Sequence, residues 1–150
     1  MPASTTAVTR TEAFERAWDD FFAATRRARG RAARDRSGGL SLAQYQLLAP
    51  VEAGGELPCG EIALAAGVAS PTATRMLDSL ARDGIVVREH SESDRRVVTV
   101  RLTPKGARLV REKGELVSAK RREIYLSLTD QEREQATVLL GRLAEAVEQL

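Results

Sequence analysis

The hydrophobic and polar positions between Ser70 and Gly84 predict a short helix with one apolar face. The apolar residues recur at intervals of three and four along this segment, as Ala73, Leu77 and Leu80. Ser70 is a favourable N-cap, and Pro71 suits the first helical position, where its missing N–H costs nothing. Gly84 suits the left-handed residue that follows a last turn. We therefore predict a helix that is capped at both ends.

The polar face of this predicted helix has two interpretations. It carries small side chains around one arginine, with Thr74 and Asp78 at the flanks: Pro71, Thr72, Arg75 and Ser79. Such a surface can lie close to base edges in a DNA major groove, because bulky side chains would hold the helix away. An ordinary amphipathic helix with a solvated polar face explains the same residues equally well. The neighbouring segments shift the balance between the two.

Two further helices are predicted before this one. A short helix from about Gly60 to Ala66 ends at Gly67, and its inward-facing residues are Ile62, Ala63 and Ala66. A short helix, a tight turn and a second capped helix together form a helix-turn-helix unit. An earlier helix extends from Leu42 to Ala53 and is stopped by two glycines. Its inward-facing residues are Tyr45, Leu47 and Leu48.

Two β-strands are predicted after the capped helix, at residues 85–90 and 96–102, because both segments are β-branched and alternate in part. The intervening residues 91–95 are too polar to pack and predict an exposed turn. A solvated hairpin loop is the plainest interpretation of that turn. Three adjacent charged residues favour contact with a phosphate or with a DNA minor groove: Asp94, Arg95 and Arg96. A helix-turn-helix followed by a basic-tipped hairpin is the layout of a winged helix-turn-helix.

Long amphipathic helices are predicted at both ends of the chain. The first begins around Thr9 and carries aromatic residues at near-helical spacing: Phe14, Trp18, Phe21 and Phe22. Thr103 caps another helix that runs to about Tyr125, and a last helix carries a broad apolar stripe: Ala136, Leu139, Leu140, Leu143, Val147 and Leu150. An intramolecular bundle would leave much of this stripe exposed. We therefore expect a seam between two copies of the chain, made by Phe14, Trp18, Leu139, Leu143 and Val147.

Several short stretches agree in order and spacing with one known family. They are Gly67-Val68, Thr72-x-Thr74-Arg75, Leu80-x-x-Asp83-Gly84-Ile85-Val86, Asp94-Arg95-Arg96, Leu102-Thr103-Pro104-Lys105-Gly106 and Leu128-Thr129-Asp130-x-Glu132. On these stretches the chain resembles the MarR family of bacterial transcription regulators from about Leu40 to its C-terminus. The resemblance implies an α+β, mostly helical fold, with a winged helix-turn-helix at about 40–103 and dimerisation helices at about 9–36 and 104–150. We expect residues 1–8 to form a disordered tail before a single domain at 9–150.

The same resemblance implies a function. A homodimer would bind a pseudo-palindromic operator in double-stranded DNA and repress transcription, and a small aromatic or anionic ligand would release it. The expected DNA-binding residues are Ser70, Pro71, Thr72, Thr74, Arg75, Ser79, Asp94, Arg95 and Arg96. By resemblance, Arg96 enters the minor groove and Asp94 holds its guanidinium. Trp18, Phe22 and Tyr45 are candidates to line a ligand pocket, although plain core packing also explains them.

Charge and composition are compatible with this interpretation. The chain of 150 residues has a net charge of only +2, but residues 70–111 carry nine basic and five acidic side chains. Residues from Asp130 onward carry five acidic side chains and two arginines, so the basic surplus lies in the middle of the chain. There is no apolar run long enough to span a membrane and no secretory signal pattern, so we expect no membrane contact. A single cysteine fits a reducing cytoplasm, and the resemblance implies a bacterial one.

Few other residues could support catalysis, metal binding or redox reactions. With one histidine, His90, and one cysteine, Cys59, no zinc set is plausible, and no enzyme or phosphate-cradling motif is present, so we expect no enzyme, metal or cofactor. A buried, unreactive Cys59 is the plainest interpretation, and a redox switch through it is an alternative. The arginines between Arg26 and Arg36 predict a solvated basic face, or else a phosphate or anionic-effector contact. A winged helix used for protein assembly without DNA is a further alternative.

Overall fold

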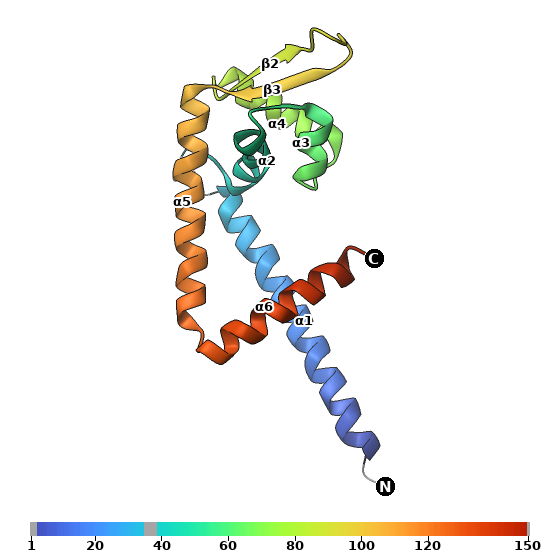
Figure 1. The fold of residues 1–150 in the computed structure, drawn as a ribbon. Coiled ribbons are helices and arrows are strands. Elements are labelled where there is room, and N and C mark those ends of the chain that lie inside the picture. Colours follow the sequence, from blue (N-terminus) through green and yellow to red (C-terminus); the bar gives the residue numbers. More distant parts are fainter. Residues whose placement is uncertain (1–2, 35–38, 150) are drawn as a thin grey trace. The chain divides into compact units, whose positions relative to one another are not determined.

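The computed structural model describes residues 3–34 and 39–149. The elements follow the order α1 (Ala3–Arg34), α2 (Leu42–Gly54), β1 (Glu56–Pro58), α3 (Cys59–Ala65), α4 (Ser70–Arg82), β2 (Val86–His90), β3 (Val98–Leu102), α5 (Pro104–Ser127) and α6 (Asp130–Val147) (Figure 1). The chain divides into two compact units, Met1–Lys113 and Gly114–Leu150. Long helices and a small sheet confirm the predicted α+β, mostly helical class.

The sheet has three antiparallel strands in the order β1-β3-β2. In the hairpin, Val86 lies opposite Leu102 and His90 lies opposite Val98, close to the prediction. The first strand, β1, was not predicted, and it pairs with β3 with Leu57 opposite Val100. Three residues are too few to show a period of two, and Pro58 lacks a backbone donor, as is usual only for edge strands.

The core of the first unit lies between the helices and one face of the sheet. Its fully buried side chains are Leu40, Leu47, Leu48, Val51, Ile62, Leu77, Leu80, Val100 and Val110. The predicted apolar face of α4 is therefore confirmed, because Ala73 is buried as well. Of the residues predicted to face inward from α2, Tyr45 is only half-buried. The core thus holds α4 against the sheet on one side and leaves its opposite side free.

The N-terminal boundary of α4 differs from the prediction by one residue. Ser70 was predicted as the N-cap, but Ala69 occupies that position, and its carbonyl accepts the N–H groups of Thr72 (2.9 Å) and Ala73 (3.0 Å). Ser70 is therefore the first helical residue, and the N-cap position itself contributes no side-chain hydrogen bond. The extended backbone at Ala69 already provides the turn into the helix, so no hydroxyl is needed there.

The C-terminal end of α4 confirms the prediction for Gly84. This glycine has a φ of 71°, in the left-handed region that favours glycine. The N–H of Gly84 donates to the carbonyl of Ala81 (3.1 Å), and the N–H of Ile85 donates to that of Leu80 (2.9 Å). These two bonds form a Schellman motif, which satisfies the last carbonyls of the helix and sends the chain into β2.

The first helix is longer than predicted. It begins at Ala3 rather than around Thr9, so residues 3–8 of the predicted tail are helical, whereas residues 1–2 lie outside the described part. Residues 3–8 contain no glycine or proline that would stop a helix, and the aromatic pattern that revealed the helix starts only at Phe14. At the other end, α1 continues through Gly30 to Arg34, and the predicted end near residue 36 falls outside the described residues.

Hydroxyl caps open the last two helices, and the cap at Thr103 was predicted. Thr103 Oγ1 accepts the N–H of Gly106 (3.0 Å) at the start of α5 and donates to the carbonyl of Gly84 (2.8 Å). Thr129 and Glu132 form a reciprocal capping box at the start of α6. The backbone N–H and hydroxyl of Thr129 both donate to the Glu132 carboxylate and hold the pKa of that carboxyl below its ordinary value.

Gly106 packs so tightly that we expect alanine there to destabilise the first unit. A Cβ at this position would clash with the carbonyl oxygen of Ile85, which is backbone and cannot rotate away. Gly106→Ala should lower the free energy of unfolding in urea by about 1–3 kcal/mol. Gly30→Ala is the control, because a Cβ at Gly30 meets nothing within 4 Å. Equal stability of the two variants would contradict the close contact.

Candidate nucleic-acid interface

The free side of α4 presents the polar residues that the sequence singled out. Ser70, Pro71, Thr74 and Arg75 are exposed, and Thr72 and Ser79 are half-buried. The turn before α4 is fixed by Gly67, which has a φ of 62°, and by the bond from the Val68 N–H to the Ala63 carbonyl (2.9 Å). The short helix α3 and the exposed helix α4 therefore form one helix-turn-helix unit.

At the tip of the β2–β3 hairpin, an acidic side chain holds an exposed arginine. Asp94 Oδ1 accepts both the backbone N–H of Arg96 (3.0 Å) and its guanidinium Nε (3.2 Å). The Arg96 side chain is nevertheless 92% exposed, so its remaining guanidinium N–H groups face solvent. In Figure 1 the hairpin extends past α4 in the same compact unit. The tip is thus an exposed cation whose direction is set by a neighbouring carboxylate.

The backbone of the same tip is held by contacts at its base. The N–H of Ser91 donates to the carbonyl of Val97 (2.8 Å), and the N–H of Val97 donates to that of Asp94 (2.9 Å). His90 Nδ1 lies 2.8 Å from the carbonyl oxygen of Arg95, which leaves the exposed Arg95 side chain out of this network. These bonds give the predicted exposed turn at residues 91–95 a defined backbone.

A contact between Arg88 and α4 was not predicted from the sequence. Arg88 on β2 forms an ion pair with Asp78 of α4, and its Nη2 lies 3.8 Å from Cys59 Sγ at the start of α3. One signal was available in the sequence, because alternation along β2 puts Arg88 on the same face as the buried Val86. A charged side chain on the covered face of a strand needs a partner in the layer beneath it.

Cys59 is half-buried and is the first residue of α3. Its contact with Arg88 gives the thiol a place in the packing between α3 and β2. Neither the unreactive role nor the redox role predicted for it is tested by this geometry. No group of three or more potential metal ligands occurs among the residues that the structure describes.

A groove of about 860 Å³ lies beside α2 in the first unit. It is lined by Arg29, Leu42, Ala43, Tyr45, Gln46, Ala49, Pro50, Ala65, Ala66, Gly67 and Val68. Of the three candidates for a ligand pocket, Tyr45 lines this groove and Trp18 and Phe22 do not, but the groove does not test whether any of them contacts a ligand. The rings of Trp18 and Phe22 pack together along α1, with centroids 4.7 Å apart, because they lie four residues apart on the same helix face.

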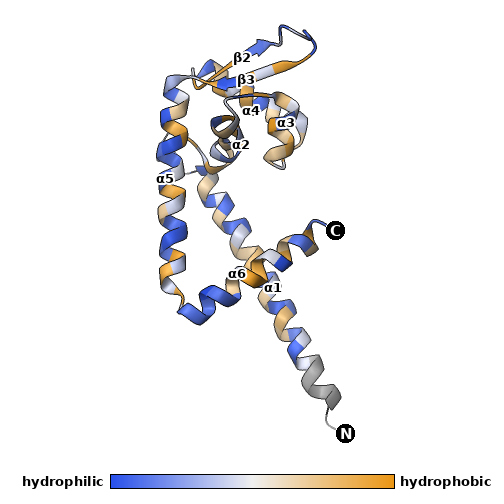
Figure 2. Ribbon diagram, in the orientation of Figure 1, coloured by the Kyte–Doolittle hydropathy of each residue, from blue (hydrophilic) through white to orange (hydrophobic). Residues whose placement is uncertain are grey.

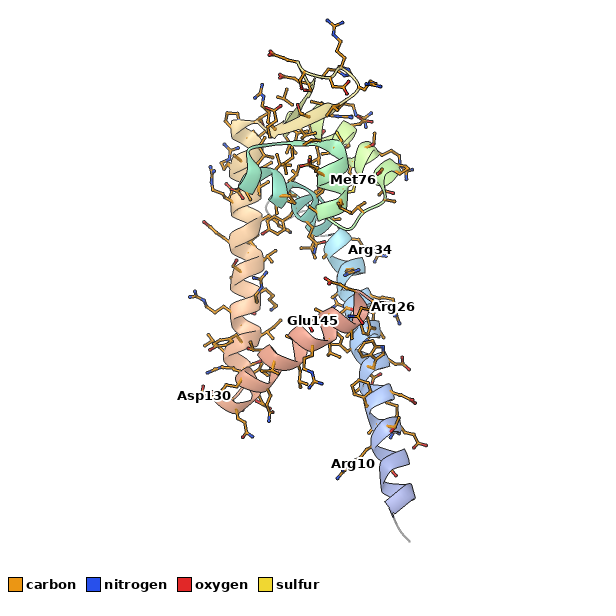
Figure 3. The ribbon with its side chains drawn as sticks, turned by 45° about the vertical axis from the view of Figure 1, so that its right-hand side comes forward. Arg10, Arg26, Arg34, Met76, Asp130 and Glu145 are labelled. Atoms are coloured by element: carbon orange, nitrogen blue, oxygen red, sulfur yellow. The ribbon has the colours of Figure 1, made fainter. Side chains whose placement is uncertain are left out.

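The arginines of the predicted basic cluster lie on the last turns of α1. Arg26, Arg27, Arg29, Arg31 and Arg34 are all exposed, and Arg36 lies outside the described residues. Figure 3 shows the side chains of Arg26 and Arg34 on this part of the helix. Arg29 alone among them also lines the groove beside Tyr45. The cluster therefore combines a solvated basic face with one cation at an apolar concavity.

The residues predicted for a seam between two copies are largely uncovered in each unit. Phe14 of the first unit is 57% exposed, and Leu139 and Val147 of the second unit are 52% and 41% exposed. Trp18 and Leu143 are half-buried. Figure 2 shows apolar residues among polar ones along α1, α5 and α6. Exposed apolar residues that recur along the same helix are typical of a surface that another chain covers.

No helix within residues 3–34 and 39–149 is long and apolar enough to cross a membrane.

Several known proteins are similar to this chain in sequence and fold. A family model described as the MarR family matches residues 40–98. The YusO protein of Bacillus subtilis is 26% identical, with 93% of this chain and 98% of that one covered at a TM-score of 0.69. A mutant of MarR from Escherichia coli in complex with operator DNA is 25% identical, with coverages of 83% and 91% and a TM-score of 0.70. FabT of Streptococcus pneumoniae in complex with DNA is 21% identical, with coverages of 93% and 98% and a TM-score of 0.74, and its likeness concerns the fold.

Proposed function

We infer that the chain belongs to the MarR family, and from this premise we propose that it is a dimeric, sequence-specific DNA-binding transcriptional regulator. The observation that carries the proposal is the pairing, in one compact unit, of an exposed polar α4 with a wing tip on which Asp94 holds the exposed Arg96. A helix and a basic hairpin can engage adjacent grooves of one duplex. We assign the winged lobe to about residues 40–103 and dimerisation to the helices on either side.

The two DNA-contacting elements have different tasks in this proposal. Exposed cations such as Arg95 and Arg96 neutralise phosphates or enter the minor groove, which supplies affinity that depends on salt. The residues of α4 approach base edges in the major groove and supply sequence readout: Ser70, Pro71, Thr72, Thr74, Arg75 and Ser79. Two copies joined by their terminal helices would present two such lobes to a pseudo-palindromic operator and repress transcription in the bacterial cytoplasm, where that DNA lies.

The groove beside α2 supports release by a small ligand. Its walls are mostly apolar, with Tyr45 as an aromatic surface and Arg29 as a cation. This combination suits an aromatic carboxylate, because the ring can pack on apolar side chains while the guanidinium binds the carboxylate. Benzoate is a simple probe of this class. Arg29→Ala should abolish any rise in thermal stability that benzoate produces in the wild type.

The decisive test of the proposed function is a gel shift with the DNA that flanks the gene of this protein. A regulator of its own or a neighbouring gene should form a discrete complex that unlabelled random DNA does not displace. Affinity should fall steeply as salt is raised, because counterions are released from the neutralised phosphates. Absence of any discrete complex would favour the alternative that the winged helix serves protein assembly.

Arg75 is expected to discriminate between DNA sequences. It is exposed on the polar side of α4, where an arginine can donate two hydrogen bonds to one guanine. Arg75→Ala should weaken operator binding by about 1–3 kcal/mol and leave binding to random DNA nearly unchanged. Fluorescence anisotropy with both DNAs measures the difference. An equal loss on both would identify Arg75 as a phosphate contact.

A further inference from the structure

Arg88 joins three elements of the winged lobe. It leaves β2 on the face that is turned toward the helices, and its guanidinium contacts the Asp78 carboxylate of α4 and the Cys59 sulfur of α3. Its Nε is buried and has no hydrogen-bond partner among the residues that the structure describes. The Arg88 side chain is 22% exposed, so the ion pair is screened less by solvent than the surface pairs of this lobe.

The carboxylate that Arg88 contacts stands beside the proposed base-reading residue. Asp78 follows Arg75 by three residues on α4, so the two side chains are neighbours on the exposed side of the helix. The Asp78 side chain is 51% exposed, and a duplex seated on Arg75 would therefore bring phosphates close to it. An acidic side chain at this position would repel DNA unless a cation neutralises it.

We infer that Arg88 is a positioning residue that neutralises Asp78, so that α4 can approach DNA without a net negative charge beside Arg75. This inference rests on the proposed function, because it explains how the DNA-facing side of α4 carries an acidic residue. The guanidinium is anchored in the sheet, so it neutralises the carboxylate from behind the helix and leaves the outer side of α4 free for the bases. Arg88 itself does not contact the duplex in this arrangement.

The test is suppression of one substitution by another. Arg88→Ala should weaken operator binding by about tenfold at 0.1 M salt, because the freed carboxylate repels the phosphates. The deficit should shrink as salt rises to 0.5 M, since salt screens this repulsion. Asp78→Asn alone should bind the operator within about threefold of the wild type. The double variant should regain affinity to within about threefold of the wild type, because it contains no carboxylate to repel DNA.

Arg101→Ala is the matched control. Arg101 is on β3 of the same wing and forms an exposed ion pair with Glu89 at 3.3 Å, so its removal takes one positive charge from the lobe without freeing an acidic residue of α4. Adding Asp78→Asn to Arg101→Ala should give no comparable recovery. Persistent weak binding by Arg88→Ala with Asp78→Asn would show that Arg88 acts by touching DNA or by packing, and it would overturn the inference. Wild-type affinity of Arg88→Ala alone would overturn it as well.

Two measurements separate an error in the role of Arg88 from an error in the proposed function. If the protein binds no operator, the wild type itself gives no signal in the gel shift, and DNA regulation is refuted. The ion pair is then tested by thermal unfolding of the wild type, the two single variants and the double variant. A Tm loss in Arg88→Ala that Asp78→Asn reverses supports Arg88 as the neutralising partner of Asp78, and purely additive losses refute that role.

Discussion

Leu143→Glu should yield a monomeric or unfolded protein that no longer holds the operator. Leu143 is on α6 among exposed apolar residues that include Leu139 and Val147, and the proposed dimer covers them with a second copy. A glutamate there would be buried without a partner, which costs several kcal/mol. Sedimentation should show the loss of the dimer. Operator affinity should drop on the order of 100-fold, because each lobe then binds its half-site alone.

Leu64→Glu is the control for this experiment. Leu64 on α3 is 84% exposed and lies outside the proposed seam, so the same substitution should leave the dimer intact. Circular dichroism separates a folded monomer from an unfolded chain. A folded Leu143→Glu dimer with wild-type operator affinity would mean that the seam lies elsewhere on the terminal helices.

The parts of the fold that depend on local chemistry were predictable from the sequence. Gly84 ends α4 because a left-handed residue is needed there, and Thr129 opens α6 because its hydroxyl accepts a free helix N–H. The apolar spacing of Leu77 and Leu80 identified the buried face of α4. Each of these features is set within a few residues, so a local pattern is enough to reveal it.

The features that the sequence did not reveal depend on contacts between distant segments or on the absence of a pattern. The strand β1 exists because Leu57 pairs with Val100, forty-three residues later. The early start of α1 follows from a polar segment that nothing interrupts, where no apolar period marks the helix. Arg88 meets Asp78 only after the hairpin folds onto α4. The ring contact between Trp18 and Phe22 along α1 and the groove beside Tyr45 likewise became visible only in the folded chain, and the role of these three residues as ligand contacts stays a prediction.

These differences matter for the proposed DNA-binding surface. Its outer residues, such as Arg75 and Arg96, were predicted from helix and turn signals and from the family resemblance, and their role in DNA binding stays a prediction. The supporting contacts beneath the surface were missed, because they join β2 to α3 and α4. A polar helix surface can bind DNA only when its acidic side chains are neutralised by residues packed beneath the helix, because phosphates are otherwise repelled. Arg88 gives this support beneath α4, whereas Asp94 orients Arg96 at the tip of the wing.

Arg96→Ala should weaken operator binding by about 1–3 kcal/mol at physiological salt without unfolding the protein. The side chain is 92% exposed and contacts only Asp94 in the turn, so its removal costs the fold little. In the minor groove the guanidinium would be attracted by the strong negative potential of the DNA, an interaction that alanine lacks. Fluorescence anisotropy on the operator measures the loss, and the urea midpoint should stay at the wild-type value.

Three companion variants define what Arg96 does. Arg108→Ala removes the same charge from α5, where Arg108 pairs with Glu112 at 3.7 Å, and it should change affinity little. Asp94→Ala should lose part of the affinity that Arg96→Ala loses, because the guanidinium then samples many directions before it meets DNA. Arg95→Ala combined with Arg96→Ala tests whether the neighbouring arginine shares the groove. Unchanged affinity in Arg96→Ala and in that double variant would remove the wing tip from the DNA-binding surface and leave α4 to hold the operator alone.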